Sequence, residues 1–256
     1  TDASMGIMLK LGAEGAKHFV DNYVLTDEFR EADKENWIHI HDKDFSLITF
    51  NCCQIDLLKL FRGGFSTGHG FLREPNSIRA YASLACIAIQ SNQNDMFGGQ
   101  SINAFDFAMA EGVRKSFRKA VVDESYKALC YRFGNPEIGS EDAFKKAFRA
   151  VMDFDACRYA EHDSDEAAQQ SVRTIAGAVG ALLRETYQKP EEAVQDMAQT
   201  IYHLACSDVV EETHQAMEAL IHNFNTLHSR AGAQVPFSSI NYGMDTSPEG
   251  RLAVRE

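Results

Sequence analysis

Apolar positions recur at helical spacing over much of the chain and predict a protein built mainly from long helices. Prolines and glycines interrupt the apolar pattern and mark where helices end. Residues 7–30 fit one or two helices. Further helices are expected at 77–93, 105–133, 141–159, 166–186 and 191–227.

Short segments whose apolar residues do not follow helical spacing separate these helices. Residues 37–42 alternate large and apolar side chains, which is typical of a strand. Residues 45–50 are expected to be extended and 56–61 to be helical, and 235–243 indicate a strand that runs into a turn. The sequence therefore predicts a mixed α/β fold with short strands between long helical segments.

The composition of the chain bears on its binding partners and on the cellular compartment in which it works. The 256 residues include 37 acidic and 25 basic side chains, a formal charge of −12, which argues against a broad nucleic-acid footprint. No segment approaches the roughly 18 consecutive apolar residues of a membrane span, and no secretory signal is recognisable. We expect a cytoplasmic protein whose six cysteines are reduced. The chain starts at Thr1 instead of Met, so we expect a piece of a longer protein.

Two histidines form the first candidate for chemistry. Alternation along a strand would place His39 and His41 on one face, with carboxylates nearby. Such a pair suits metal ligation or proton exchange. Histidines hydrogen-bonded into the core are the alternative. If His39 and His41 are metal ligands, the alternative function is a metal-dependent barrel hydrolase, which would need further ligands at later strand ends.

The second candidate is the sequence Asn51-Cys52-Cys53. Neighbouring cysteines do not readily form a relaxed disulfide, and they point in different directions, so at most one faces a given pocket. A thiol at a strand end, beside an amide, suits redox chemistry. Burial of both as small apolar side chains is the alternative. The other cysteines fall in helical patterns and are expected in the core: Cys86, Cys130, Cys157 and Cys206.

Two further segments combine turn residues with polar groups. Glycine-rich residues 63–70 and 98–101 match neither standard nucleotide-binding motif. Residues 234–243 place hydroxyls, amides and a glycine at a strand end, where they suit an oxygen-rich ligand. For the residues that follow, turn capping by Ser, Thr and Asp is the simpler explanation.

The order of these segments resembles the anaerobic (class III) ribonucleoside-triphosphate reductases. The resemblance runs from about Ile7 to the last residue and is most specific over 213–251. It implies a ten-stranded α/β barrel, with 1–256 as the N-terminal part of the catalytic domain. The ATP-cone and the C-terminal glycyl radical and zinc domain are not in this chain. The matching segments are His39–Asp42, Asn51–Asp56, Gly64–Gly70, Gln93–Gln100 and Asn225–Gly243.

The family's chemistry supplies the functional expectation. The resemblance implies anaerobic reduction of ribonucleoside triphosphates to deoxyribonucleoside triphosphates, for DNA synthesis, by glycyl and thiyl radicals. Formate or a thioredoxin-type protein is the reductant, and a radical-SAM enzyme activates the homodimer. Deoxynucleotides and ATP are the effectors, and neither nucleic acid nor membrane is a partner. A nucleotide-binding, dimerising fragment without catalysis is the alternative for this chain taken alone.

The resemblance also assigns residues. It implies a catalytic role for Cys52 beside the substrate, with Asn51 and with His39 near the ribose, while Cys53 is less suited. No metal site is expected in this chain. Substrate binding is expected from Gln234, Ser238, Ser239 and Asn241. Effector binding is expected from Gln93, Asp95, Lys115 and Lys119.

Overall fold

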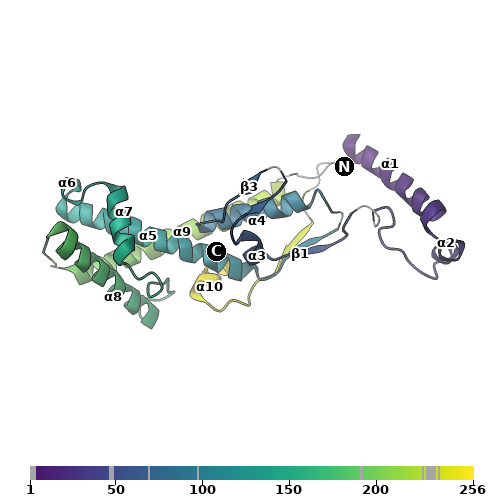
Figure 1. Ribbon diagram of the computed structural model, residues 1–256. Helices are drawn as coiled ribbons and strands as arrows, with labels where there is room; N and C mark the ends of the chain where they lie inside the picture. Colours follow the sequence, from purple (N-terminus) through teal and green to yellow (C-terminus); the bar gives the residue numbers. More distant parts are fainter. Residues whose placement is uncertain are drawn as a thin grey trace. The chain divides into compact units, whose positions relative to one another are not determined.

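The computed structural model describes residues 4–45, 49–68, 70–96, 98–190, 193–226, 228, 235 and 237–256. The chain divides into two compact units (Figure 1). The first unit comprises Thr1–Arg73, Leu84–Phe105 and Leu220–Asn241. The second comprises Glu74–Ser83, Asp106–Ala219 and Tyr242–Glu256.

A three-stranded parallel sheet with the order β1-β4-β5 is the centre of the first unit. Its strands are β1 (Cys53–Ile55), β4 (Gln100–Ile102) and β5 (Ser238–Ile240). In the register of the sheet Gln54, Ser101 and Ser239 are level with one another. Because side chains alternate along a strand, these polar residues share one face, and the isoleucines of all three strands share the other.

The helices of the first unit have recognisable starts. Thr26 caps α2 by accepting the Phe29 N–H on its Oγ1 at 3.4 Å. Asp56 caps α3 by accepting the Lys59 N–H at 3.1 Å. The antiparallel hairpin β2–β3 (Phe65–Ser66 and Phe71–Leu72) follows α3. The helices are α1 (Ser4–Phe19), the π-helix η1 (Val20–Val24), α2 (Asp27–Lys34), α3 (Leu57–Phe61) and α4 (Ile78–Asn92), whose first residues belong to the second unit.

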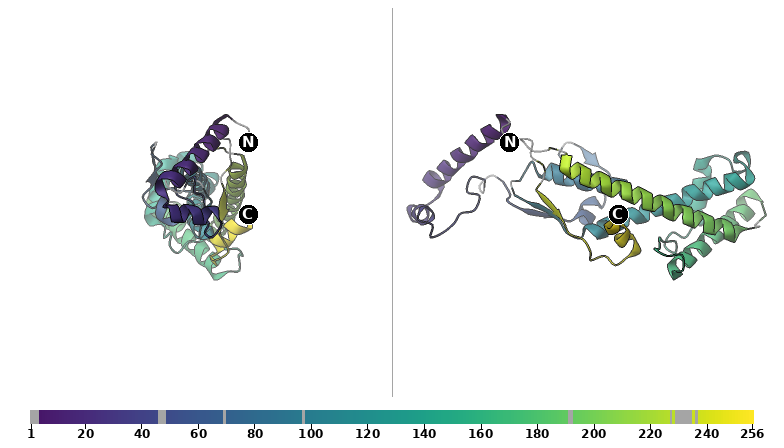
Figure 2. Two further views of the ribbon diagram at one scale, coloured as in Figure 1. Left: turned by 90° about the vertical axis from the view of Figure 1, so that its right-hand side faces the viewer. Right: turned by 180° about the vertical axis from the view of Figure 1, so that it is seen from behind.

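The second unit is a helical assembly in which α9 lies along α5 (Figure 2). The two helices meet at Phe117 and Tyr202, whose ring centroids are 5.9 Å apart. Phe144 and Phe148, both fully buried, join α7 to this core. Among the described residues, no helix combines the length and apolar character needed to cross a bilayer. Its helices are α5 (Phe105–Phe133), α6 (Asn135–Ile138), α7 (Glu141–Val151), α8 (Glu166–Ala181), η2 (Leu182–Tyr187), α9 (Val194–Thr226), whose residues from Leu220 belong to the first unit, and α10 (Pro248–Arg255).

A carboxylate at the start of α5 holds the segment before α10. Asp106, which is fully buried, accepts the backbone N–H groups of Gly243, Met244 and Asp245 on one oxygen, each at 2.8 Å. Its other oxygen accepts the N–H of Phe107 at 3.1 Å. Burial disfavours the charged form, but these four donors outweigh it and lower the pKa of Asp106 from its ordinary value.

The mixed α/β class is confirmed, with a mostly helical chain and a small parallel sheet. The helices predicted at 77–93, 105–133 and 191–227 correspond to α4, α5 and α9. The ten-stranded barrel stays a prediction. The strand predicted at 235–243 is present, although only its residues Ser238–Ile240 are paired.

Two predictions are wrong. Residues 37–42 form no strand but an irregular segment and a turn. Asp33 accepts the Ile40 N–H at 3.2 Å, a bond that replaces a strand neighbour. The helix predicted over 141–159 ends at Val151, because Asp153 accepts the N–H groups of Asp155 and Ala156 and fixes a turn instead.

Candidate functional site

One face of the β1-β4-β5 sheet is polar and accessible. Gln54 and Ser101 lie side by side on it, and alternation adds Cys52, two residues before Gln54. Cys52 is exposed, as are most of the polar residues on this face. A cavity of about 580 Å3 lies over it. The residues that line this cavity are Cys52, Cys53, Gln54, Gly99, Gln100, Ser101, Phe237, Ser238 and Ser239.

A chain of side-chain hydrogen bonds connects all three strands across the polar face. Asn103 donates from Nδ2 to Gln54 Oε1 at 2.8 Å. Its Oδ1 accepts both the Ser101 hydroxyl and the Asn241 amide, each at 3.1 Å. Since each bond restricts the next side chain, the network fixes amide and hydroxyl groups in one layer beside the thiol. Such a layer suits a ligand rich in hydroxyls.

The two adjacent cysteines have different surroundings. The Cys52 thiol donates to Asn51 Oδ1 at 3.6 Å and opens toward the cavity. Cys53 is half-buried, and Asn92 donates to its sulfur at 2.9 Å from the end of α4. Asn92 also donates to Gln100 Oε1 at 2.8 Å, so it packs the inner face of the sheet. Both cysteines line the cavity, but Asn92 holds the Cys53 sulfur on the inner face, whereas Cys52 is exposed.

The backbone next to Cys52 passes very close to a glycine. A Cβ on Gly98 would lie 2.1 Å from the carbonyl oxygen of Asn51, a distance that no side chain allows. Gly98 is therefore required by the approach of two backbones. A parallel bridge between Phe50 and Met96 joins the same two segments just before it. Together these contacts position Asn51 and Cys52 at the entrance to the sheet.

The other cysteines belong to packed regions, as expected, although Cys157 lies in the irregular segment after α7 and not in the predicted helix. Cys86 and Cys157 are buried, and Cys130 and Cys206 are half-buried. Burial raises the pKa of Cys86 and Cys206 to about 11 and that of Cys157 to about 12. These three thiols stay protonated near neutral pH, so they are poor nucleophiles.

The histidine pair lies apart from the polar-face contacts described above. The rings of His39 and His41 are 5.7 Å apart, and His41 approaches Asp42 at 3.2 Å. No described contact joins His39 to Cys52. Within the described residues, no group of three or more His, Cys, Asp or Glu side chains is arranged to hold a metal ion. The predicted substrate residue Gln234 lies outside the described residues.

The four predicted effector residues have unlike environments. Gln93 is buried at 3% exposure, and Asp95 lines a cavity of about 920 Å3 between β1, α3 and α4. Lys115 donates to Glu74, to the Pro75 carbonyl and to the Tyr81 hydroxyl at 2.8, 3.0 and 3.1 Å. Lys119 is exposed. Gln93 and Asp95 belong to the first unit, and Lys115 and Lys119 belong to the second.

The sequence reasoning missed three residues of the polar face, namely Gln54, Ser101 and Asn103. Gln54 could have been found from its position two residues after Cys52 on an expected strand. The other two depend on the pairing of β1 with β4, which are separated by more than forty residues of helix and turn. That pairing leaves no local signal.

Comparison with known proteins agrees with the resemblance. The family model described as "Anaerobic ribonucleoside-triphosphate reductase" matches residues 1–255. Enzymes of that name from Salmonella typhimurium and Escherichia coli are each 31% identical over 106 residues, which is 41% of this chain and 15% of theirs. The one from Enterobacteria phage T4 is 26% identical over 136 residues, 51% of this chain and 22% of its own. The chain thus matches only a small part of the length of these relatives, and it belongs to the anaerobic ribonucleoside-triphosphate reductase family.

Proposed function

We propose that the protein containing this chain reduces ribonucleoside triphosphates to deoxyribonucleoside triphosphates, with Cys52 as the thiol that acts at the ribose. The observation that carries the proposal is the placement of Cys52. Its thiol lies on the same sheet face as an ordered layer of amides and hydroxyls, beside a cavity of about 580 Å3. A ribose offers the hydroxyl groups that this layer is suited to bind.

The reaction defines what the residues must do. The C2′–OH bond is replaced by a C2′–H bond and water leaves, which consumes two electrons and two protons. The radical chemistry comes from a glycyl radical outside this chain, and the electrons come from formate or a thioredoxin-type dithiol. Cys52 supplies hydrogen at C2′, and Asn51 orients the thiol by accepting its hydrogen bond. Ser239 and Asn241 bind the sugar hydroxyls, and Ser238 lines the same cavity. We retain His39 and Gln234 as residues near the ribose.

The proposal includes the partners of the family. A radical-SAM enzyme activates a cytoplasmic homodimer that holds a structural zinc outside this chain, and deoxynucleotides or ATP tune its choice of substrate. Asp95 and Lys119 remain candidates for effector binding, as does the buried Gln93. Lys115 is the weakest of the four, because its three hydrogen bonds occupy the donors of its ammonium group. Deoxynucleotide formation would serve DNA synthesis.

The test compares two neighbouring thiols in the intact, anaerobically activated protein. We expect Cys52→Ser to reduce deoxynucleotide formation to background, because a hydroxyl does not donate hydrogen in radical chemistry as a thiol does. Ribonucleoside triphosphate binding, measured at equilibrium, should change little. Cys53→Ser is the matched comparison: Cys53 also lines the cavity, but its sulfur accepts a hydrogen bond from Asn92 on the inner face, so we expect this variant to keep more activity than Cys52→Ser.

Two outcomes would contradict the proposal. Full activity of Cys52→Ser would remove this thiol from the reaction. Loss of nucleotide binding together with activity would indicate that Cys52 maintains the cavity instead of reacting. If neither the parent protein nor the variants form product while nucleotides still bind, a binding role without catalysis is the better description.

A further inference from the structure

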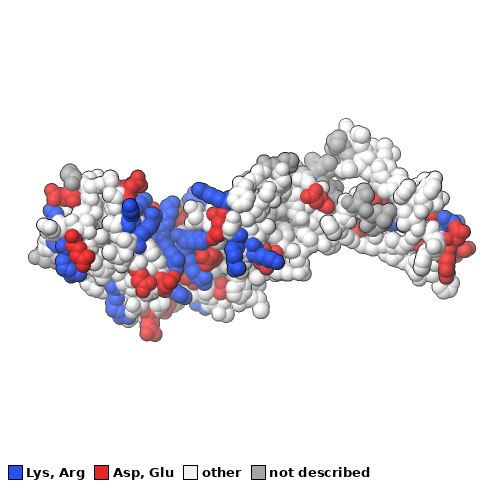
Figure 3. Space-filling view, in the orientation of Figure 1, with Lys and Arg blue, Asp and Glu red and all other residues white. Residues whose placement is uncertain are grey.

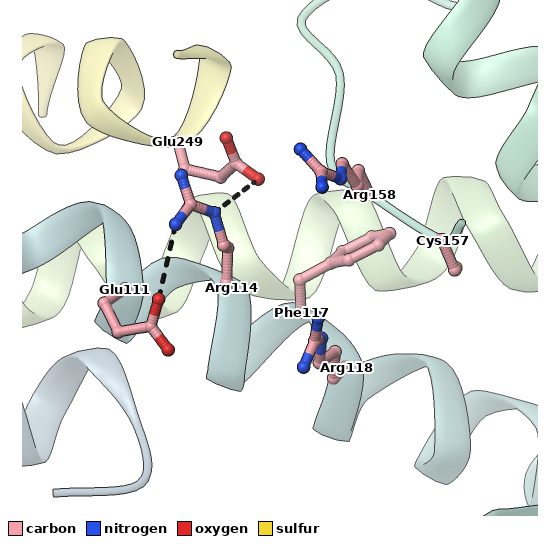
Figure 4. A pocket seen from close by; sticks show the side chains of 7 residues that line it. All are labelled: Glu111, Arg114, Phe117, Arg118, Cys157, Arg158 and Glu249. Carbon is pink, nitrogen blue, oxygen red and sulfur yellow. Dashed lines mark hydrogen bonds and ion pairs between the residues drawn. The ribbon is translucent and has the colours of Figure 1, made fainter. Parts of the chain in front are cut away.

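The polar groups of the sheet face differ in kind from those of the second unit. Figure 3 shows Lys and Arg side chains gathered over α5. On this helix Arg114 donates to the carboxylates of Glu111 and Glu249, each at 3.3 Å (Figure 4). The sheet face instead carries amides and hydroxyls, which have no charge, so the direction of each hydrogen bond decides what the face binds. These residues are Gln54, Ser101, Asn103, Ser239 and Asn241.

Asn103 is the centre of the hydrogen bonds on this face. Its Oδ1 accepts the Ser101 hydroxyl and the Asn241 amide, each at 3.1 Å. Its Nδ2 donates to Gln54 Oε1 at 2.8 Å. If the Asn103 amide were turned by 180°, two donors would face each other toward Asn241 and two acceptors toward Gln54. The partners therefore fix one orientation of the Asn103 side chain.

The orientation of Asn103 determines which group Gln54 offers to a ligand. Because the Gln54 oxygen is already bonded, its Nε2 with two N–H groups is left, and no acceptor for it is found among the residues that the structure describes. Gln54 is exposed and lines the cavity of about 580 Å3. It follows Cys52 on the same face, about 6.6 Å along the strand. A fixed N–H donor thus lies beside the thiol.

Asn241 offers the opposite kind of group on the other side of the face. Its Nδ2 is bonded to Asn103, so its Oδ1 is left as an acceptor. Its backbone is held as well, because its N–H donates to the Ile102 carbonyl at 2.9 Å and its carbonyl accepts the Phe105 N–H at 3.0 Å. The face therefore has a donor on β1 and an acceptor directly after β5. Two neighbouring hydroxyls, one accepting and one donating, match this order.

On the basis of the proposed reduction of ribonucleotides, we propose that Gln54 donates to the 2′ oxygen of the ribose and that Asn103 is the positioning residue that turns Gln54 for this contact. Asn241 accepts from the 3′ hydroxyl. As the C2′–O bond breaks and water leaves, negative charge develops on the departing oxygen, and an N–H group fixed toward that oxygen stabilises the charge. Gln54 and Asn103 are chemically unchanged by the reaction.

The same hydrogen bond distinguishes the substrate from the product. The deoxyribonucleotide has no 2′ oxygen, so it offers the Gln54 N–H groups no acceptor. A site built to bind a hydroxyl discriminates against the analogue that lacks it. The polar face should therefore bind the ribonucleotide more tightly and release the reduced product.

The test measures binding of CTP and dCTP to the intact, unactivated protein, in which no radical consumes the substrate. Labelled CTP reports occupancy, and dCTP is the competitor. We expect the parent to bind CTP about tenfold or more tightly than dCTP. Gln54→Ala and Asn103→Asp should each bring the ratio of the two dissociation constants close to one. An aspartate at 103 accepts from Gln54, so it would turn the Gln54 oxygen toward the ligand.

A double variant tests whether Asn103 acts through Gln54. Adding Asn103→Asp to Gln54→Ala should change the ratio no further, because the group that Asn103 positions is already absent. A merely structural Asn103 would instead weaken the binding of both nucleotides equally and leave the ratio unchanged. Asn135→Asp, at an exposed position at the start of α6, is the control for the added charge and should keep the parent's ratio. Thermal unfolding checks that each variant folds.

Cys52→Ser separates this inference from the proposed reaction. It should abolish product formation but keep the parent's ratio of dissociation constants, because binding needs no radical. If Cys52→Ser still forms product while the ratio responds to Gln54 and Asn103 as expected, only the role of Cys52 is refuted. The inference on Gln54 and Asn103 is overturned if the parent binds CTP and dCTP equally, or if Gln54→Ala and Asn103→Asp keep the parent's ratio.

Discussion

Single residues decide much of the second unit's local order, and Asp106 is the strongest example. One carboxylate satisfies four backbone N–H groups, three of which belong to the turn that leads into α10. This turn has no regular backbone hydrogen-bond pattern, so its N–H groups depend on the Asp106 carboxylate as their acceptor. The lowered pKa of Asp106 expresses the same preference for the charged form.

The first prediction concerns Asp106→Asn. The amide retains one acceptor oxygen but loses the charge, so we expect a local stability loss of about 1–3 kcal/mol. Hydrogen exchange of the Gly243, Met244 and Asp245 amides should accelerate accordingly. The pKa of Asp106 is lower in the folded than in the unfolded protein. The extra stability of the parent over the variant is therefore fully present above the unfolded-state pKa of about 4, and it is lost as the pH falls through the folded-state pKa.

The control for this prediction is Asp142→Asn, since Asp142 is exposed in the first turn of α7. It should leave those three amides unchanged. Equal exchange rates in Asp106→Asn and the parent at neutral pH would contradict the prediction. So would a difference that grows as the solution is acidified below pH 4.

How far the sequence predicts single residues depends on how local their contacts are. Alternation predicts different directions for Cys52 and Cys53, and Asn92 binds the Cys53 sulfur on the inner face while Cys52 is exposed, although both residues line the cavity. Asn103 was not predicted. It acquires its role through strand pairing, because its partners Gln54 and Asn241 are distant in sequence.

At the scale of elements, the close approach of the 98–99 turn to the segment before β1 yields the second prediction. Gly98→Ala would force the Asn51 carbonyl away from a Cβ placed 2.1 Å from it. A displacement of about 1 Å at Cys52 should cost on the order of a hundredfold in product formation. The overall fold should survive, because the strain is confined to one strand entrance.

Gly177→Ala is the control, because Gly177 lies in α8, does not line the cavity, and would place its Cβ where no neighbouring atom of the described residues lies within 4 Å. We expect its activity in the anaerobic assay to equal that of the parent. Equal activities of the two alanine variants would show that the approach of the backbones is not needed at the thiol.

The long helices were predictable because their apolar periodicity is sustained and their ends are marked. α5 ends before Gly134, and Pro75 precedes α4. The failure at 37–42 has a physical cause. Asn36 and Asp42 have positive φ, which bends the chain at both ends of the alternating residues and prevents a strand from extending. Alternation alone does not reveal such bends.

At the scale of the whole molecule, no strand of the described residues pairs with the outer edge of β1 or of β5 in the parallel sheet. Cys53 donates its N–H to the carbonyl of Gly99, just before β4, so the N–H of Gln54 points away from β4. Asn241 likewise donates to Ile102, which directs the N–H of Ile240 outward. Parallel sheets are normally covered on both faces and continued at their edges.

The third prediction follows from this openness. If the barrel proposed from the family is correct, the rest of the protein adds strands beside β1 and β5. The Gln54 and Ile240 amides should then be as strongly protected from hydrogen exchange in the intact protein as those of Cys53 and Asn241. Fast exchange confined to Gln54 and Ile240 would show that the sheet ends at β1 and β5.

The adjacency of Cys52 and Cys53 has a consequence for errors in folding and for evolution. A one-residue slip of β1 exchanges the two faces of a strand and would ordinarily remove a reactive group from its site. Here the slip would bring Cys53 to the place of Cys52, so a sulfur would still lie on the polar face. For the proposed reaction the doubled cysteine is therefore a redundancy against a shift in one direction: a single deletion before the strand places Cys53 where Cys52 lies, whereas a single insertion places Asn51 there.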